Sequence, residues 1–319
     1  MCRKIFSFIL CSAALLLLSG CFLFVLPDEP SSEIANAVKY QPGEKTYHLY
    51  SDDDWFCALQ IFLPAETERP FPAAIIFPGG AYGVLDFHVE GTEYAKFLAR
   101  NGMAGIVVKY PLGSIFGHFQ RHPAMQQAAQ RAMRLIRTHA KALNIDPGKV
   151  GTMGSSAGGH LAALTALGST DGKKDAADPV ERHSAKPDFV VMCYPVVSMG
   201  EVAHRTSRSN LLGSDPTQEQ KDALSLEKQI KPGFPPTFLW LTLEDRCVDP
   251  GNGKLMDAAL KKHGIPHKTL IFQHGPHGMG LLSKKQKQLY PETATWSGEL
   301  LKFLREQQIL PHDGKRAER

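Results

Sequence analysis

The chain has 319 residues, 43% of them hydrophobic and 21% charged. This is the composition of an ordinary globular protein, with room for one large α/β domain or two small ones. Its 36 Lys and Arg residues against 32 Asp and Glu residues give a formal net charge of +4. A balance this close to neutral does not indicate a nucleic-acid-binding protein, and we expect no nucleic-acid partner.

The first residues have the pattern of a targeting segment. Two basic residues, Arg3 and Lys4, precede a long apolar run, and no acidic residue occurs before Asp28. This pattern predicts a secretory signal over residues 1–20. The signal ends in the letters LSGC, which resemble the lipobox of bacterial lipoproteins, and that resemblance implies that Cys21 is the lipidated first residue of the mature chain. An uncleaved membrane anchor is the alternative, and either reading predicts an extracytoplasmic, membrane-anchored protein of the cell envelope.

Loss of the signal changes the charge and the cysteine count. Residues 1–20 contain two basic and no acidic residues, so their removal leaves 34 against 32, a net charge of +2. Of the six cysteines, two lie in the signal and Cys21 is taken by the anchor, so the chain is not a disulfide scaffold. We expect the other three to be buried thiols, because they lie in or beside apolar strand-like runs: Cys57, Cys193 and Cys247.

Strand-like and helix-like runs alternate after a spacer that follows Cys21 and ends near residue 43. The predicted strands are 45–50, 55–63, 73–77, 105–110, 150–154, 189–194, 237–243 and 268–272, the first two forming an antiparallel pair. The predicted helices are 93–101, 124–143, 257–263 and 294–307. The alternation predicts an α/β domain over residues 44–310, with a mostly parallel central sheet and helices on both faces, followed by a polar tail at 311–319.

Residues 198–236 interrupt this alternation, because they contain polar residues without a strand-forming run. The segment is interpreted either as a substrate cap over the strand ends or as a solvated connection with a surface helix at 218–228.

The most informative motif is the sequence GSSAG at residues 154–158, between a strand-like run at 149–153 and a helix-like run at 160–167. A G-x-S-x-G turn from strand to helix is typical of the nucleophile elbow of α/β-hydrolases, in which small flanking residues let a serine oxygen project from a tight turn. Ser156 is therefore the candidate nucleophile. Its partners should follow in the order acid and then histidine.

Three carboxylates are candidates for the catalytic acid, because all of them follow the predicted strand 237–243. Asp245 is the first choice, since Val248 follows it three residues later and gives the D-x-x-V spacing common in these enzymes; its role would be to orient and stabilise the imidazolium. Asp249 is the alternative, and its structural role would be to cap the helix after Pro250. Glu244 is the third candidate.

The base is expected after the last predicted strand, in the sequence QHGPHGMG at 273–280. His277 is the first choice, because Gly275 and Gly278 allow the loop to fold back over the sheet edge and imidazole exchanges a proton near neutral pH. His274 is the alternative, with a structural role as a strand-end residue bonded to the backbone. The four histidines between 263 and 277 are spread over a helix end and two loops, so no metal and no other cofactor is predicted.

Attack on an ester creates an oxyanion that needs preorganised N–H donors, one from the residue after the nucleophile and others from the loop after the third strand. The sequence PGGAY at 78–82 follows the strand 73–77 directly. The amides of Gly80, Ala81 and Ala157 are therefore the predicted oxyanion hole. A plain Pro-Gly-Gly turn is the alternative interpretation.

Several motifs together carry a family resemblance: PGGAY at 78–82, HVEG at 88–91, the elbow with GHL at 159–161, and HG at 277–278. They resemble the carbohydrate-esterase-type α/β-hydrolases, namely the BD-FAE-like acetyl xylan and feruloyl esterases that are sometimes labelled xylanases. The resemblance spans about residues 45–307. It implies a triad of Ser156, Asp245 and His277, and an acyl ester of a plant or algal polysaccharide as substrate. Ala81 stands where the family usually has a third glycine and Pro111 where many members have arginine, which affects the substrate more than the reaction.

We therefore expect a serine esterase that hydrolyses short acyl esters, in which Ser156 forms an acyl-enzyme and no cofactor takes part. The partners would be an ester substrate, small or polymeric, and a membrane reached through the lipid anchor. A serine peptidase of the prolyl-oligopeptidase type is one alternative, since those catalytic domains share the fold and the D-x-x-V spacing. A catalytically inactive surface binding protein of the same fold is the other.

Overall fold

The computed structural model describes residues 44–48, 57–65, 69–117 and 119–311. The expected signal, the lipidated Cys21, the spacer up to residue 43 and residues 312–319 of the polar tail lie outside the described residues. The strands are β1 (Glu44–His48), β2 (Ala58–Phe62), β3 (Phe71–Phe77), β4 (Ala104–Lys109), β5 (Ile145–Ser155), β6 (Val190–Cys193), β7 (Thr237–Thr242) and β8 (His267–Phe272).

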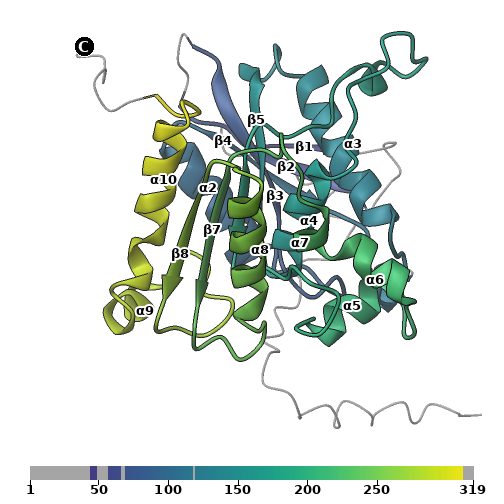
Figure 1. Cartoon of the computed structure of the whole chain (residues 1–319). Helices are drawn as coiled ribbons and strands as arrows, with labels where there is room; N and C mark the ends of the chain where they lie inside the picture. Colours follow the sequence, from purple (N-terminus) through teal and green to yellow (C-terminus); the bar gives the residue numbers. More distant parts are fainter. Residues whose placement is uncertain (1–43, 49–56, 66–68, 118, 312–319) are drawn as a thin grey trace, which may run out of the picture.

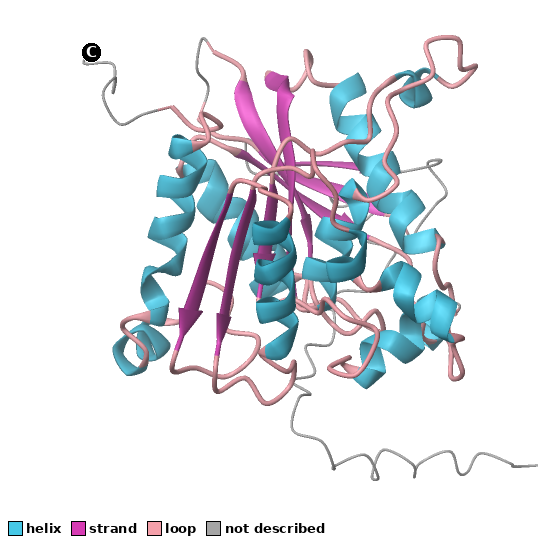
Figure 2. Cartoon of the chain, in the orientation of Figure 1, coloured by secondary structure: helices cyan, strands magenta, loops and turns pink. Residues whose placement is uncertain are grey.

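The α-helices are α2 (Glu93–Arg100), α3 (Ala124–Thr138), α4 (Ala157–Ala166), α5 (Arg205–Leu212), α6 (Gln218–Leu224), α7 (Leu226–Gln229), α8 (Gly251–Lys262), α9 (Lys284–Leu289) and α10 (Trp296–Glu306). A π-helical segment, η1 (His88–Thr92), leads into α2, and short 3₁₀ segments occur at Ile115–Gly117, Pro179–Arg182 and Thr293–Thr295. Figure 2 shows the strands gathered in the middle of the molecule, with helices on either side of them.

The described strands form one eight-stranded sheet in the order β1-β2-β4-β3-β5-β6-β7-β8. β1 pairs with β2 and β2 pairs with β4 in antiparallel fashion, whereas every pair from β4 to β8 is parallel. The predicted α/β fold with a mostly parallel sheet and an antiparallel opening pair is therefore confirmed. Parallel strands buried on both faces explain why β3, β6 and β7 are runs of apolar residues without alternation.

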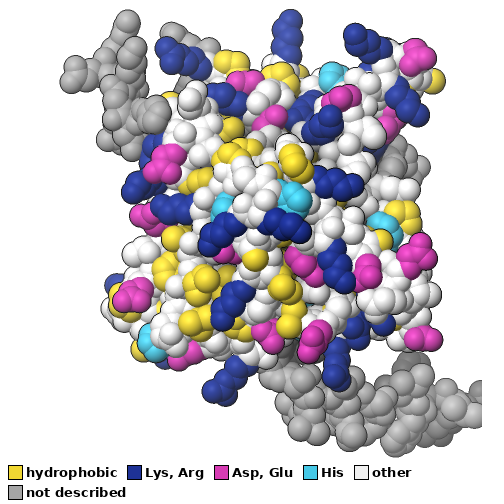
Figure 3. Space-filling model, viewed as in Figure 1, with side chains coloured by type: hydrophobic (Ala, Val, Ile, Leu, Met, Phe, Trp, Pro, Cys, Tyr) yellow, Lys and Arg dark blue, Asp and Glu magenta, His cyan; other side chains and the backbone are white. Residues whose placement is uncertain are grey.

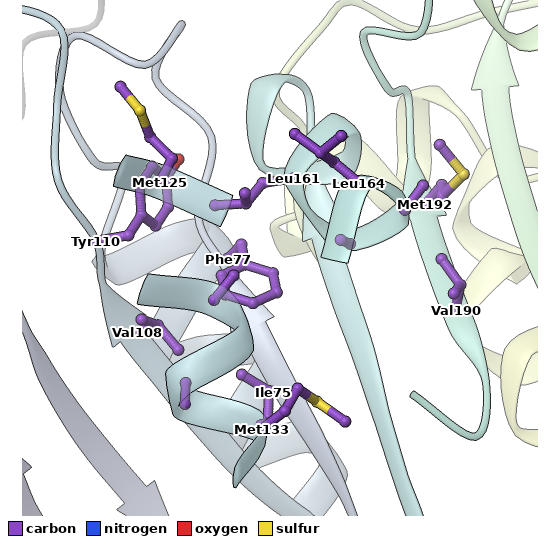
Figure 4. Close-up of a cluster of buried hydrophobic side chains, with 14 of the residues drawn as sticks. Ile75, Phe77, Val108, Tyr110, Met125, Met133, Leu161, Leu164, Val190 and Met192 are labelled. Carbon is purple, nitrogen blue, oxygen red and sulfur yellow. The ribbon is translucent and has the colours of Figure 1, made fainter. Parts of the chain in front are cut away.

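Helices cover both faces of the sheet, as Figure 1 shows. On one face α3, α4 and α8 pack on the sheet through a cluster that includes Ile75, Met133 and Leu161. Figure 4 shows part of this cluster, with Phe77 and Val108 of the sheet facing Met125 and Leu161 of the helices. On the other face α2 and α10 pack through a second cluster, whose large members are Tyr94, Trp240, Trp296 and Phe303. Burial of these side chains at about 25 cal/mol per Å² is the main force holding the layers together.

Three predicted elements differ from the observed ones by at least five residues at one end, whereas the other bounds differ by three residues or fewer. β5 starts at Ile145 rather than 150, because Ile145 pairs with Phe71 and Val150 with Ala73, and the turn-like residues between them lie in a register shift. α3 ends at Thr138 rather than 143, and a turn follows in which the N–H of Ile145 bonds to the carbonyl of Ala140 at 2.8 Å.

The helix predicted at 257–263 starts six residues earlier, at Gly251. Gly251 and Gly253 have low helix propensity, which hid the first turn from the sequence pattern. The structure shows why Gly253 is needed there: a Cβ atom at this position would lie 2.2 Å from Cδ2 of Leu241 in β7. The helix can approach the sheet this closely only with a glycine.

The segment 198–236 contains three short helices, α5, α6 and α7, rather than strands. α6 begins with a capping box in which Thr217 and Gln220 exchange side-chain and backbone hydrogen bonds. The surface helix expected at 218–228 is thus divided into α6 and α7 by a break at Ser225.

Charged side chains of both signs are interspersed over the face of the molecule shown in Figure 3, and hydrophobic side chains gather in its lower left part. None of the helices in the described ranges has the length and hydropathy that crossing a membrane requires. The parallel strands place the loops that follow β3, β5, β6, β7 and β8 at one edge of the sheet, which is where open α/β sheets bind their ligands.

Candidate active site

Ser156 is the single residue between β5 and α4, and its backbone is strained. Its φ of 53° and ψ of −122° lie outside the regions that L-residues favour, a conformation that costs about 1–3 kcal/mol. Its amide donates to the carbonyl of Cys193 at 3.0 Å, and its own carbonyl accepts from Val196 and His160. Such strain is typical of a serine presented on a sharp turn for reaction.

The two glycines of the motif have separate packing reasons. A Cβ atom on Gly154 would lie 2.1 Å from the carbonyl oxygen of Gly158, and one on Gly158 would lie 2.0 Å from the carbonyl oxygen of Phe77. Both distances are far below van der Waals contact. The motif is therefore required by the closeness of the start of α4 to its two neighbouring strands.

Asp245 and His277 are brought together from loops 32 residues apart. Oδ2 of Asp245 lies 2.6 Å from Nδ1 of His277, and Oδ1 accepts hydrogen bonds from the amides of Cys247 at 2.8 Å and Val248 at 2.9 Å. The side chains are 2% and 13% exposed, respectively. Since an ionised carboxylate only accepts hydrogen bonds, Nδ1 carries the proton and Nε2 is left able to accept one. The backbone amide of the valine in the D-x-x-V pattern thus donates one of these two bonds.

The alternative candidates have other partners. Oδ1 of Asp249 accepts from the amide of Gly251, the first residue of α8, at 2.7 Å, although the N-cap residue of this helix is Pro250 and not Asp249. Glu244 accepts at its two oxygens from Nδ1 of His274 at 2.9 Å and from the amide of Gly275 at 3.1 Å. His274 thus bonds to a carboxylate through its side chain, and not to the backbone as its expected structural role required.

The loop after β3, residues 78–84, has an unusual backbone that suits it to donate N–H groups. Gly80, Ala81 and Tyr82 have φ values of 128°, 56° and 58°, and successive left-handed residues turn their amides to a common side as in an anion-binding nest. Among the hydrogen bonds of the described residues, none uses the amide of Gly80, Ala81 or Ala157 as donor. These are the three amides predicted to form the oxyanion hole.

Hydrogen bonds to α4 and α5 hold this donor loop, residues 78–84, against the helices. The hydroxyl of Tyr82 lies 2.7 Å from Nδ1 of His160, and Nε2 of His160 lies 2.8 Å from the carbonyl oxygen of Leu224 in α6. Burial lowers the pKa of His160 to about 4, so the ring is neutral: Nε2 donates to Leu224 and Nδ1 accepts from Tyr82. Nδ2 of Asn210 in α5 donates to the carbonyl of Ala81 at 2.9 Å. The 198–236 segment therefore supports the loop directly.

The donor loop, the elbow and the base loop lie next to one another. A Cβ atom built on Gly79 would be 3.1 Å from Cβ of Ser156. The ring of Tyr194, which follows Cys193 at the end of β6, packs edge-on against the ring of His277 with centroids 4.9 Å apart. Since the amide of Ser156 bonds to Cys193, the ends of β3, β5, β6 and β8 meet around the serine.

Several residues near the site were not predicted from the sequence. Glu90 is buried and bonds to the donor loop, and Tyr194 contacts His277. Cys247 is only partly buried, contrary to expectation, and its Sγ lies 3.8 Å from Nε2 of His204, whereas Cys57 and Cys193 are buried as expected. The only sequence signal for Glu90 was its place within the HVEG motif. The contact of Tyr194 with His277 joins residues far apart in the chain and leaves no signal in the sequence.

Chemically, the arrangement offers a serine on a strained turn, an imidazole held by a buried carboxylate, and unused amides beside the serine. Within the described residues, no group of three His, Cys, Asp or Glu side chains is placed to hold a metal ion. A sheet of this topology carrying such residues at its strand ends defines the α/β-hydrolase class, and the chain has this fold.

Comparison with known proteins then places the chain within that class. The BD-FAE family model matches residues 59–260, so the chain belongs to the BD-FAE family. It is 36% identical over 205 residues to endo-1,4-beta-xylanase B of Butyrivibrio fibrisolvens, covering 64% of this chain and 32% of that protein. It is 31% identical over 260 residues to an acetylxylan esterase of Xylanibacter ruminicola, covering 79% of this chain and 50% of that protein. The chain thus spans half or less of the length of these two relatives.

A solved structure of a similar protein supports the family assignment, and the match covers nearly the full length of that protein's chain. The acetyl ester-xyloside bifunctional hydrolase of Caldicellulosiruptor lactoaceticus superposes with a TM-score of 0.77 and 34% sequence identity. The match covers 85% of this chain and 99% of that one. The similarity therefore spans nearly the whole of that chain.

Proposed function

We propose that this protein is a serine esterase that removes short acyl groups, acetyl above all, from a xylan-type polysaccharide. The observation that carries the proposal is the buried bond between Asp245 and His277 at the strand ends that also present Ser156. The substrate class is supported by the names of the similar proteins, which include an acetylxylan esterase and an acetyl ester-xyloside hydrolase.

In the first half of the reaction, Oγ of Ser156 attacks the ester carbonyl carbon while Nε2 of His277 takes the hydroxyl proton. The carbonyl oxygen becomes an oxyanion, which the amides of Gly80, Ala81 and Ala157 stabilise. Donors of this kind contribute about 10²–10³-fold each to the rate. His277 then gives its proton to the sugar oxygen, the ester C–O bond breaks, and the acyl group remains on Ser156.

In the second half, His277 takes a proton from a water molecule whose oxygen attacks the acyl carbon. A second oxyanion forms at the same amides and collapses, the bond from the acyl carbon to Oγ breaks, and the proton on His277 returns to Ser156. The carboxylic acid leaves and the enzyme is restored. The chain's own groups supply every proton transfer.

The test is hydrolysis of acetyl, butyryl and feruloyl esters and of acetylated xylan, assayed beside a proline-containing peptide substrate. Wild-type protein is expected to release acetate, to react with a fluorophosphonate probe, and to lose both properties on Ser156→Ala. Ser169→Ala is the matched control, because its hydroxyl bonds only to the carbonyl of Ala166 at the far end of α4. Ester hydrolysis that persists in Ser156→Ala overturns the mechanism.

Two other outcomes would replace the esterase with an alternative. Cleavage of the peptide without hydrolysis of any ester would make the protein a serine peptidase. Absence of both probe labelling and turnover would make it a binding protein with a hydrolase fold.

We further propose that Cys21 is lipidated and that the domain is tethered to a membrane outside the cytoplasm. The support is the sequence alone, namely the basic and apolar segment that ends in LSGC. Full-length protein expressed in a bacterial host with an alkyne fatty acid should incorporate the label and fractionate with membranes. Cys21→Ala should abolish labelling and Cys11→Ser, in the apolar segment, should not; labelling that survives Cys21→Ala refutes the anchor.

A further inference from the structure

Glu90 is a buried carboxylate to which the proposed mechanism gives no part. Its side chain belongs to η1, just after the donor loop, and the residue is 3% exposed. None of the salt bridges between described residues includes it. A buried carboxylate without a cationic partner costs free energy on ionisation. Its contacts must therefore explain why a charge-bearing side chain occupies this place.

The first contact of Glu90 is with the donor loop. Oε2 accepts a hydrogen bond from the amide of Gly79 at 2.8 Å. A Cβ atom on Gly79 would lie 2.4 Å from this oxygen and 3.1 Å from Cβ of Ser156. The carboxylate therefore lies directly against the start of the loop, on the side next to the nucleophile, and no side chain fits between them.

The second contact of Glu90 is with Tyr194, which leads to the base loop. The hydroxyl of Tyr194 donates to Oε1 of Glu90 at 2.8 Å and accepts from the amide of Gly280 at 3.1 Å. The Tyr194 ring packs edge-on against His277, with an interplanar angle of 68°. η1 also touches the base loop directly, because a Cβ atom on Gly280 would lie 2.6 Å from Cγ1 of Val89.

We propose that Glu90 is a positioning residue that holds the donor loop and the base loop at a fixed separation, through Gly79 on one side and Tyr194 on the other. In its ionised form it accepts both hydrogen bonds at once. His277 and the amides of Gly80 and Ala81 then converge on one ester carbonyl. A displacement of about 1 Å between such groups costs about 10²-fold in rate. This inference rests on the proposed esterase function and adds a device that sets its geometry.

Protonation of Glu90 would weaken the two hydrogen bonds that hold the loops. The surroundings of Glu90 raise its pKa, so this protonation occurs near neutral pH. Burial, and then the charge of Asp86, raise the pKa of Glu90 to about 7, while His277 and the hydrogen bonds from Tyr194 and Gly79 act to lower it. Four further titratable groups lie near Glu90, on α2, at the end of β6 and just after β4 and β6, and burial raises the pKa of each so that all remain neutral: Tyr94, Tyr110, Cys193 and Tyr194.

The sign of the linked stability follows from this shift. The pKa of folded Glu90, about 7, is above its usual 4.5, so the folded state prefers the protonated form. The associated stability is present below about pH 4.5 and is lost as the pH rises through about 7. Ionised Glu90 therefore destabilises the fold while it completes the hydrogen bonds that position the loops, and activity and stability should respond to its removal in opposite directions.

The test is Glu90→Gln, which keeps the shape of the side chain and removes its charge. We expect kcat for an acetyl ester at about pH 8 to fall by about tenfold to a hundredfold with KM changed by less than about twofold. The acid limb of the log kcat profile should lose the ionisation of Glu90, so its slope should change from near two to near one. The melting temperature at about pH 8.5 should rise relative to wild type, and should rise less at about pH 5.5.

Two further variants make the test decisive. Glu93→Gln, an exposed carboxylate one turn later, is the matched control and should leave kcat and the acid limb unchanged. Tyr194→Phe keeps the ring against His277 and removes only the hydroxyl, so kcat should fall and the acid limb should move to higher pH as Glu90 loses a hydrogen bond. If Glu90→Gln does not fold, Tyr194→Phe decides alone.

Wild-type kcat and an unchanged acid limb in Glu90→Gln, or in Tyr194→Phe, overturn the proposal. A loss of kcat together with an equal fall in melting temperature at both pH values also overturns it, because that result indicates damage to the fold. Failure of the esterase function would be visible separately, as ester hydrolysis that does not require Ser156.

Discussion

The loops after β7 and β8 are joined by two histidine–carboxylate pairs that differ in burial. Nδ1 of His277 is 2.6 Å from Asp245, and Nδ1 of His274 is 2.9 Å from Glu244. The side chains of the first pair are 13% and 2% exposed and those of the second pair 62% and 49%. Water surrounds the outer pair and screens it, so the same type of bond has a much smaller energetic effect there.

Backbone support separates the pairs further. Oδ1 of Asp245 accepts hydrogen bonds from the amides of two consecutive residues, Cys247 and Val248. The other carboxylate oxygen of Asp245 therefore has a fixed direction toward His277. Glu244 has a longer side chain and shares its oxygens between His274 and the amide of Gly275. The comparison teaches that proximity to a histidine does not define a catalytic acid. Burial and a rigid second hydrogen-bonding partner distinguish the inner carboxylate.

The largest difference between the pairs should appear on replacement of each carboxylate by its amide. Asp245→Asn would place an N–H donor against Nδ1 of His277, so the proton moves to Nε2 and the ring can no longer accept one from Ser156. We expect kcat to fall by about 10⁴-fold, measured with an acetyl ester at about pH 8. Glu244→Gln is the matched control and should change kcat by less than about twofold. Similar losses in both variants would show that the outer pair also acts in catalysis.

A smaller effect is expected when the inner carboxylate is kept and lengthened. Asp245→Glu adds one methylene group, so the side chain cannot bond to the amides of Cys247 and Val248 and to His277 in the present geometry. Misplacement of about 1 Å lowers the rate by about 10²-fold, and kcat should fall by this amount while the protein remains folded by circular dichroism. A kcat equal to that of the wild type would mean that backbone support of the acid is unimportant.

The smallest effect concerns the stability of the outer pair. The hydrogen bond from His274, and then that from Gly275, lower the pKa of Glu244 below its usual 4.5. A lowered pKa contributes stability above about pH 4.5 that is lost as the pH falls through the value in the folded protein. His274→Gln should therefore lower the melting temperature by no more than about 2 °C at pH 7, and this difference should shrink below about pH 4.5. A difference that does not shrink below about pH 4.5 contradicts the assignment.

Much of the site followed from the sequence because its residues stand next to strand ends that are recognisable as apolar runs. The position of Ser156 between β5 and α4, and those of Asp245 and His277 after β7 and β8, needed only the order of elements. The sequence did not predict the start of two elements correctly. Glycines concealed the first turn of α8, and β5 includes turn-like residues at a register shift. In both places packing against the sheet outweighs local propensity.

The sequence by itself determined the class of fold, the presence of the elbow and the order of the candidate catalytic residues, since these depend on periodicity and on neighbours along the chain. Only the tertiary structure decided which carboxylate bonds to His277, because Glu244, Asp245 and Asp249 are within five residues of one another and differ mainly in direction and burial. It also decided the contacts of Glu90, whose partners Gly79 and Tyr194 are 11 and 104 residues away. Hydrogen bonds of that span are set by the packing of the sheet and leave no periodic trace in the sequence.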